Sequence, residues 1–417
     1  MRVIAVIAEY NPFHKGHEYL IKKAREAVGD PRAIVLSIMS GSFTQRGLPA
    51  VIPKYSRAKQ ALKCGSDVVI ELPFEWACAP ANEFAEGAIK TLMSTGVVTD
   101  IAFGIDSGSS EMINALADPD IHDLDKFKSA LKNNLSAGRS FPKARAEALI
   151  ECVRGFDSEK LSECLHSPNS ILAVEYLKAM KKHGADFKVH MIKRVGQDYF
   201  SDNVNDDSGF MSANAIRKII ASDSSLSAIA EGIAGKMPDK AASVMLSEIS
   251  NGLYHPCDYE GYIMRAVTTQ LTGISDIRFM GDGLGGHIAN TFEKLREDDM
   301  LFDKVSSALY TKHFAMPRIY RALTMMMMGV RADEIGYDPQ YIRVLGFNHD
   351  GRYCLKIMGN CAKLPIIHNQ SDLLELYSSN PDLRHSAKLN LAADDLAGSF
   401  MGMVPGKTWN TPPVTVK

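Results

Sequence analysis

The sequence predicts an α/β fold: a parallel sheet covered by helices, followed by a mainly α-helical domain. In the first hundred residues, short apolar runs rich in β-branched residues alternate with segments of helical periodicity. These runs are continuously apolar, which is typical of strands buried on both faces of a parallel sheet. After residue 222 the pattern is mostly helical. We therefore expect two domains, residues 1–222 and 223–417.

The expected strands and helices of the first domain alternate along the chain. Strands are expected at residues 3–8, 33–39, 67–73, 100–104 and 187–195, and helices at about 17–28, 82–96, 168–184 and 212–220. The run 222–243 is rich in small residues and is interpreted as a boundary or connector between the domains. Beyond it, 317–330 is the clearest amphipathic helix, and 341–358 has a strand-like pattern.

The composition is that of a soluble globular protein, with 46% apolar and 23% charged residues. The formal net charge is −2, so a polyanionic partner requires local basic patches. Residues 126–145 and 311–331 contain basic but no acidic residues, although a solvated helix face gives the same pattern. Scattered cysteines without a CxxC pair, and a first apolar run too short for a signal peptide, predict a cytoplasmic protein without a membrane span.

The segment EYNPFHKGH, residues 9–17, follows the first strand and leads into the first helix. Ligands of parallel sheets bind at this edge, and the N-terminus of a helix favours anions such as phosphate. His14 and His17 could donate hydrogen bonds to phosphoryl oxygens there, Gly16 lets a ligand approach the backbone, and Pro12 fixes the turn. The alternatives are two surface histidines near a turn, or a zinc pair, for which no third ligand has suitable local spacing.

FHKGH matches the HxGH signature of the nucleotidyltransferase superfamily that adenylates substrates with ATP. Further segments occur in the order AEYNPFHKGH, MSGSFTQRGLPAV, SDVVIELP, NEFAEGAIKTL, FGIDSGS, SFPKARAEAL, SPNSILAVEYLKAM, MSANAIRK, TKHFAMPRIYRAL and YIRVLGFN. Together they resemble the tRNA(Met) cytidine acetate ligase family, from Val3 to about Ile367. The resemblance implies a Rossmann-like nucleotidyltransferase domain over residues 1–222, and a mainly helical domain that contacts tRNA over 223–417.

The resemblance also implies the reaction. ATP, as co-substrate and accompanied by Mg²⁺, would activate acetate as acetyl-adenylate and release pyrophosphate. The acetyl group would then pass to N4 of the wobble cytidine, C34, of elongator tRNA(Met). The sequence has neither a GxxxxGK[ST] P-loop nor the Gly-rich loop of acetyl-CoA-dependent acetyltransferases, which agrees with this chemistry.

By the same resemblance, three residues are catalytic: His14, His17 and Arg217. The expected ATP contacts are Ile7, Ala8, Glu9, Tyr10, Asn11, Pro12, Phe13, His14, Lys15, Gly16, His17, Glu18, Tyr19, Leu20, Gly104, Asn169, Arg194, Val195 and Ser212. Gly104 is alternatively a plain turn glycine, Asn169 a helix cap, and Ser212 a cap without a ligand. The chain departs from the family pattern at Ser170, where the second asparagine of PNN is expected, and at residues 196–202.

The residues that would bind acetate or tRNA have less distinctive sequence patterns. Gln45 and Arg46 follow the second strand, where Arg46 suits either acetate or an RNA phosphate. Expected tRNA contacts in the basic patches are Lys143, Arg145, Lys312, Arg318 and Arg321. No acidic pair identifies itself as a Mg²⁺ site. Two other functions stay open: a small-molecule adenylyltransferase of the pantetheine-phosphate or nicotinate-nucleotide type, and a non-catalytic RNA-binding protein.

Overall fold

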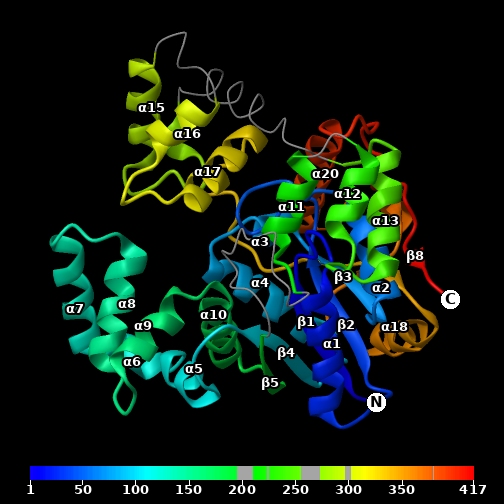
Figure 1. The fold of residues 1–417 in the computed structure, drawn as a ribbon, viewed down its shortest axis with the longest axis horizontal. Coiled ribbons are helices and arrows are strands. Elements are labelled where there is room, and N and C mark those ends of the chain that lie inside the picture. The colour runs from blue at the N-terminus through cyan, green and yellow to red at the C-terminus, as the bar shows by residue number, and fades with distance from the viewer. Residues whose placement is uncertain (195–209, 223–224, 255–272, 296–301, 379) are drawn as a thin grey trace.

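The computed structural model describes residues 1–417 except 195–209, 223–224, 255–272, 296–301 and 379 (Figure 1). Five strands form the parallel part of its sheet in the order β5-β4-β1-β2-β3. Their bounds are β1 Val3–Ala8, β2 Ile34–Ser40, β3 Val68–Leu72, β4 Asp100–Ile105 and β5 Lys188–Lys193. The expected parallel sheet is confirmed. Because the chain runs from β1 to β2 and β3 and returns to β4 on the other side of β1, the switch point lies between β1 and β4.

Both faces of β1 are buried, which explains its unbroken apolar sequence. Ala5 and Ile7 pack in the core with residues of α4 and α10, whereas Val6 packs in a second cluster with residues of α2, α11 and α13. Alternate strand residues point to opposite faces, so a strand covered on both sides is apolar at every position. The covering helices are α1 Lys15–Val28, α2 Lys54–Lys63, α3 Phe74–Ala77, α4 Ala81–Ser94, α10 Pro168–His183 and α11 Ala213–Ser222.

Residues from the end of the chain complete the sheet. β6, Ile342–Phe347, pairs antiparallel with β3 and carries β7, Ile366–Ile367, and β8, Val414–Thr415. The strand-like pattern at 341–358 is confirmed for its first half, and α18 occupies His349–Cys361. The sheet therefore contains strands from both sides of the boundary predicted at residue 222, and the residues after that boundary are not simply a helical addition.

The run 222–243 is not a connector, and that interpretation was wrong. It contains α12, Leu226–Ile233, and the start of α13, Asp239–Ser250. Ile229, Ile233 and Ala241 belong to the same core cluster as Val6 of β1. Gln60 Nε2 of α2 also donates a hydrogen bond to Ala241 O at 2.9 Å. Small residues allow helices to approach closely here, so the composition that suggested a linker reflects packing.

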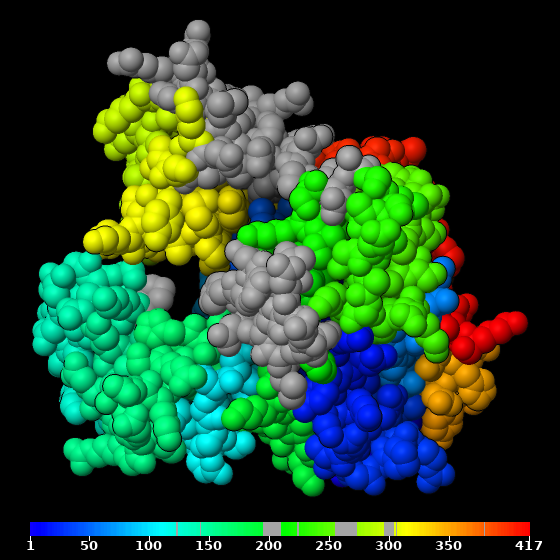
Figure 2. All heavy atoms as spheres, in the orientation of Figure 1, coloured from blue at the N-terminus to red at the C-terminus, as the bar shows by residue number. Residues whose placement is uncertain are grey.

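Two further groups of helices extend from the sheet on one side. The first contains α5 Ser110–Leu116, α6 Pro119–Asp123, α7 Asp125–Ser136, α8 Phe141–Cys152 and α9 Ser158–His166. The second contains the 3₁₀ helix η1 Ile274–Asp276, α15 Leu284–Lys294, α16 Phe302–Leu309 and α17 Met316–Met328. Figure 2 shows the molecule hollowed between the first group, in teal, and the second, in yellow.

The remaining helices are α19, Gln370–Tyr377, and α20, Pro381–Ser399. α20 packs in one core cluster with α17, where Met325 and Met326 are fully buried, so these methionines fill the core. Among the helices of the described residues, none has the length and apolar character needed to span a membrane.

Candidate active site

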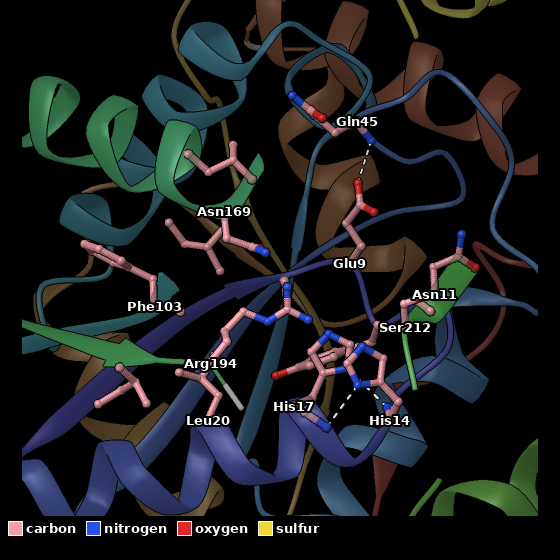
Figure 3. Close-up of a pocket in the computed structure, with 18 of the residues that line it drawn as sticks. Glu9, Asn11, His14, His17, Leu20, Gln45, Phe103, Asn169, Arg194 and Ser212 are labelled. Atoms are coloured by element: carbon pink, nitrogen blue, oxygen red, sulfur yellow. Dashed lines mark hydrogen bonds between the residues drawn. The ribbon is translucent and has the colours of Figure 1, made fainter. Parts of the chain in front are cut away.

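A cavity opens at the carboxyl ends of β1 and β4, beside the first turns of α1 and α11 (Figure 3). This is the switch point of the sheet, where parallel sheets bind their ligands. Most of the residues predicted to contact ATP line it, together with two predicted for other roles. They are Ile7, Ala8, Glu9, Tyr10, Asn11, His14, Gly16, His17, Tyr19, Leu20, Gly104, Asn169, Arg194 and Ser212, with Gln45 and Arg217.

Four residues of the predicted ATP segment do not line the cavity: Pro12, Phe13, Lys15 and Glu18. Phe13 is buried and its ring centroid lies 5.4 Å from that of His17, so it supports that ring from the core. Glu18 is exposed on the first turn of α1. Successive residues of a turn and a helix point in different directions, so one segment cannot present all its side chains to one ligand. Val195 lies outside the described residues.

A tight turn after β1 carries the two histidines. Tyr10 has a φ of 47°, and its hydroxyl is hydrogen-bonded to Ser37 Oγ of β2 at 2.8 Å. α1 begins at Lys15, about two residues earlier than expected, with His14 as its N-cap. The histidines therefore stand at the N-terminus of α1, where unpaired amides and the helix dipole favour anions.

Backbone amides fix the orientation and the tautomer of both imidazoles. His14 Nδ1 accepts from Gly16 N at 3.0 Å, and His17 Nδ1 accepts from His14 N at 3.2 Å. A neutral imidazole that accepts at Nδ1 carries its proton on Nε2. The rings stack with centroids 3.8 Å apart. Gly16 is required because a Cβ atom there would lie 2.8 Å from His14 Cε1. Each ring thus keeps Nε2–H as its donor for a ligand.

Both imidazoles are neutral near pH 7 without a ligand. Burial, followed by the charge of Arg194, lowers the pKa of His17 to about 3. The pKa of His14 is also well below its usual value, mainly through burial, then through electrostatic coupling to His17 and through the charges of Arg194 and Arg217. Two neutral rings can stack without repulsion, and each still donates one hydrogen bond to a phosphoryl oxygen.

On the other side of the cavity, Asp106 holds two predicted residues in place. Arg194 Nη1 donates to Asp106 Oδ1 at 2.9 Å, and Asn169 donates to the same carboxylate from Nδ2 and from its backbone amide. Gly104 makes room for the arginine stem, because a Cβ atom there would lie 3.1 Å from Arg194 Cγ. In Figure 3, Arg194 extends toward the histidine rings. Gly104 is therefore more than a turn glycine.

The alternative that Asn169 caps a helix is wrong. Pro168 occupies the first position of α10, so Ser167 is the N-cap and the Asn169 side chain turns to Asp106. The departure at Ser170 is also accounted for. Its hydroxyl donates to Ser107 O at 2.9 Å and accepts from Ser107 N at 3.2 Å, which fixes the loop after β4.

α11 contributes a second helix N-terminus to the cavity. Ser212 Oγ accepts from Ala215 N at 3.1 Å, which confirms that Ser212 is a cap. Arg217, one turn further, donates to Asn11 O at 2.6 Å and to Asn214 Oδ1 at 3.2 Å. These bonds connect α11 to the turn that carries the histidines and place Arg217 on the cavity wall.

The loop after β2 forms the third wall. The Glu9 carboxylate accepts a hydrogen bond from Gln45 N at 2.7 Å, drawn in Figure 3, and Gln45 O accepts one from Arg321 of α17 at 3.0 Å. Arg57, fully buried on α2, donates to Glu9 O at 2.7 Å, to Ser40 O at 3.0 Å and to Gly41 O. One guanidinium therefore joins the ends of β1 and β2.

The residues predicted to contact tRNA differ in their surroundings. Lys143 and Lys312 are exposed, and Arg46 is half-buried. Arg145 donates to the buried Glu175 at 2.7 Å, and Arg318 pairs with the exposed Asp282 at 3.0 Å. Arg321 turns inward to Gln45, and burial lowers its pKa to about 10, so it remains charged near pH 7. Its position makes it a support for the loop after β2, and its contact with tRNA stays a prediction.

Several residues of the site could not be predicted from the sequence. Asp106 and Arg57 had no motif to mark them, although GIDSGS contains Asp106 directly after a strand. Apolar residues on the wall were also missed, namely Phe84, Phe103, Leu172, Tyr176 and Ile192. Their sequence pattern is that of ordinary core residues, and only the fold separates the wall of a cavity from the core. Within the part of the chain that the structure describes, no three His, Cys, Asp or Glu side chains gather as a metal site.

Comparison with known proteins gives matches over nearly the whole chain. Residues 1–404 match the family described as HIGH Nucleotidyl Transferase. Among curated proteins, the chain is 32% identical over 404 residues to the tRNA(Met) cytidine acetate ligase of Acetivibrio thermocellus, which covers 95% of this chain and 94% of that protein. It is 34% identical over 413 residues to the protein of the same name from Syntrophomonas wolfei, with the same two coverages, 95% and 94%.

The structural comparison agrees. The crystal structure of Thermotoga maritima TmcAL bound with alpha-thio ATP matches with a TM-score of 0.88 and 30% identity over 100% of both chains. The apo form of the same protein matches with a TM-score of 0.90. The chain belongs to the tRNA(Met) cytidine acetate ligase family, within the HIGH nucleotidyl transferases.

Proposed function

We propose that this protein is an ATP-dependent ligase that activates acetate as acetyl-adenylate. It then transfers the acetyl group to N4 of the wobble cytidine, C34, of elongator tRNA(Met). The observation that carries the proposal is the pair of Nε2–H donors, His14 and His17, fixed by backbone amides at the N-terminus of α1. Family membership supplies the acceptor. The reaction takes place in the cytoplasm, where ATP and tRNA meet.

In the first half-reaction, an acetate oxygen attacks the α-phosphate of ATP and pyrophosphate leaves. The two imidazoles donate to phosphoryl oxygens as negative charge builds up there. Arg217, beside the N-terminus of α11, and Arg194 add positive charge around the phosphates. The nucleoside lies along Gly104, Asn169 and Arg194, at the ends of β4 and β5. All these groups are in place before the ligand binds, so little reorganisation is needed.

Magnesium enters as a companion of ATP. Mg²⁺ commonly keeps several waters and is bound through substrate phosphates with few protein ligands. A cavity with a single carboxylate, Glu9, among its described lining residues fits a metal held mainly by ATP. Bound in this way, the ion would neutralise part of the phosphate charge.

The hollow between the two helix groups suits a large acceptor. The exposed Lys143 belongs to α8 and the exposed Lys312 precedes α17, and these two helix groups flank the hollow in Figure 2. Basic residues far from the reaction centre would hold tRNA phosphates and orient the anticodon. A small-molecule adenylyltransferase has no need of such a surface, and the preoriented His14 and His17 argue against a non-catalytic RNA-binding protein.

The direct test is product formation. The purified protein is incubated with ATP, acetate and transcripts of elongator and initiator tRNA(Met), and digested RNA is analysed by mass spectrometry for N4-acetylcytidine. We expect the product only with the elongator tRNA, ATP and acetate together. The absence of product with elongator tRNA(Met), in a preparation that binds ATP, would contradict the proposed function.

A further inference from the structure

Glu9 is the only acidic residue among the described residues that line the cavity. ATP, pyrophosphate and acetate are all anions, and the remaining charged groups of the wall, Arg194 and Arg217, are cations. A carboxylate repels these ligands, so its presence in an anion site is unfavourable unless another ligand provides hydrogen-bond donors. ATP provides such donors through its adenine amine and ribose hydroxyls, and the acceptor provides one through the exocyclic amine of cytidine.

The position of Glu9 separates it from the phosphate clamp. In Figure 3 its side chain points toward Gln45 and away from His14 and His17. The Gln45 amide holds one carboxylate oxygen at 2.7 Å, and Gln45 in turn is bonded to Arg321 of α17. No hydrogen bond to the other oxygen, Oε2, occurs among the described residues, although the backbone of Glu9 is fixed by Arg57. The carboxylate is thus preoriented, with one oxygen available to a ligand.

Glu9 also lies near an apolar wall that suits a methyl group. Phe84, Phe103 and Tyr176 are buried on the cavity wall, and the Phe103 and Tyr176 rings have centroids 5.5 Å apart. Burial, and after it the negative charge of Glu9, raises the pKa of Tyr176.

We propose that Glu9 is the catalytic base of the second half-reaction and receives a proton from N4 of the cytidine. This inference rests on the proposed function. The N4 lone pair forms a bond to the acyl carbon of acetyl-adenylate. The bond between that carbon and the phosphate oxygen breaks, and AMP leaves with the electron pair. The N4 proton passes to Glu9 Oε2 and then to solvent.

A base is needed because the N4 lone pair is delocalised into the pyrimidine ring, which makes the amine a weak nucleophile. Removal of the proton while the bond forms avoids a cationic intermediate, and such assistance contributes on the order of 100- to 10,000-fold in rate. The first half-reaction needs no such base, since acetate is already an anion. Glu9 should therefore affect the two half-reactions differently.

The test compares the half-reactions in Glu9→Gln, which keeps an oxygen to accept the hydrogen bond from Gln45. Acetate-dependent exchange of labelled pyrophosphate into ATP should remain within about threefold of wild type, while acetylation of elongator tRNA(Met) falls by about 100-fold or more. Hydroxylamine, a small and strong nucleophile, should still trap the adenylate as acetohydroxamate at the wild-type rate. Glu26→Gln, at an exposed position of α1, is the control and should leave both reactions unchanged.

Three results would overturn the proposal. In Glu9→Gln, tRNA acetylation at the wild-type rate shows that no base is needed at this position. Loss of pyrophosphate exchange or of hydroxamate formation together with acetylation places Glu9 in the first half-reaction or in the structure of the loop. If Glu9→Gln needs a higher Mg²⁺ concentration for pyrophosphate exchange, the Glu9 carboxylate binds the metal instead of acting as the base. Failure of the wild-type protein to exchange pyrophosphate with acetate would instead contradict the proposed function.

Discussion

His14 and His17 each use Nδ1 to accept a backbone hydrogen bond, which leaves Nε2–H as the donor toward a ligand. A pair of histidines is often assumed to bind phosphate as cations. Here burial keeps both neutral, so in the proposed ATP site each would act through one directed hydrogen bond, and Arg194 and Arg217 would supply the positive charge. The division of tasks allows the rings to stack at 3.8 Å without repulsion.

Removal of one imidazole should affect the first half-reaction selectively. We expect His17→Ala to lower acetate-dependent pyrophosphate exchange by about 100- to 1,000-fold, the usual effect of losing one donor to a transition state. Binding of tRNA, measured by filter retention, should stay within about twofold. Exchange at the wild-type rate in this variant would show that the phosphates bind elsewhere.

The lowered histidine pKa values also predict a pH dependence of stability. The unfolded chain takes up protons on these histidines below about pH 6.5, whereas folded His17 stays neutral until about pH 3. The ligand-free protein should therefore lose stability as the pH falls through this window. Urea unfolding between pH 7 and pH 4.5 should show a smaller loss for His17→Asn than for wild type, and equal losses would contradict the assignment.

Asp106 holds Arg194 and Asn169, two predicted ATP contacts, in place, although it is not itself on the cavity wall. Asp106→Asn removes the charge that holds the guanidinium, worth about 1.5–3 kcal/mol for a charge-assisted hydrogen bond. We expect the KM for ATP in pyrophosphate exchange to rise about tenfold, with the KM for acetate nearly unchanged. Asp186→Asn, at an exposed position before β5, is the matched control. Equal effects of both variants on the KM for ATP would show that Asp106 has no specific role in the ATP site.

At the scale of elements, α2 holds the ends of β1 and β2 together. Arg57 is fully buried and donates to four carbonyls, those of Ile52, Glu9, Ser40 and Gly41. Burial lowers the pKa of Arg57 to about 10, so the guanidinium is still charged near pH 7. The loops that form the cavity thus depend on one side chain that does not line the cavity.

Loss of this side chain should destabilise the whole domain. Arg57→Leu leaves four carbonyls without their donor, and breaking a buried polar network of this kind costs about 3–5 kcal/mol. We expect a lower urea midpoint with an unchanged slope, whereas Arg32→Leu, on the exposed turn before β2, should change little. A midpoint within error of wild type for Arg57→Leu would contradict this role.

The elements that could be predicted from sequence are those whose pattern reflects local burial. The five parallel strands and helices such as α4, α10 and α17 agree with prediction within a few residues. The histidine loop could be predicted because its residues are close in sequence. Asp106 and Arg57 could not, since their partners lie far away in the chain. Small residues at 222–243 indicated a linker, but those of α12 and α13 reflect close helix packing, which depends on tertiary contacts.

For the whole molecule, the arrangement of helix groups around the hollow in Figure 2 predicts where tRNA binds. We expect Lys143→Glu with Lys312→Glu to weaken binding of elongator tRNA(Met) and to reduce its dependence on salt, because fewer counterions are released. Lys59→Glu, exposed on α2, is the matched control. Pyrophosphate exchange should not change in either variant. If the double variant binds tRNA with unaltered affinity, these lysines are ordinary solvated surface residues without a tRNA contact.

The late position of β6 in the sequence determines when the sheet can be completed during synthesis of the chain. Until Ile342–Phe347 is made, the outer edge of β3 has no partner, although its residues are fully buried in the finished protein. An open, apolar strand edge is a template for pairing with other chains. The nascent protein thus carries an aggregation-prone edge through most of its translation, and a fragment ending at residue 222 would keep that edge permanently.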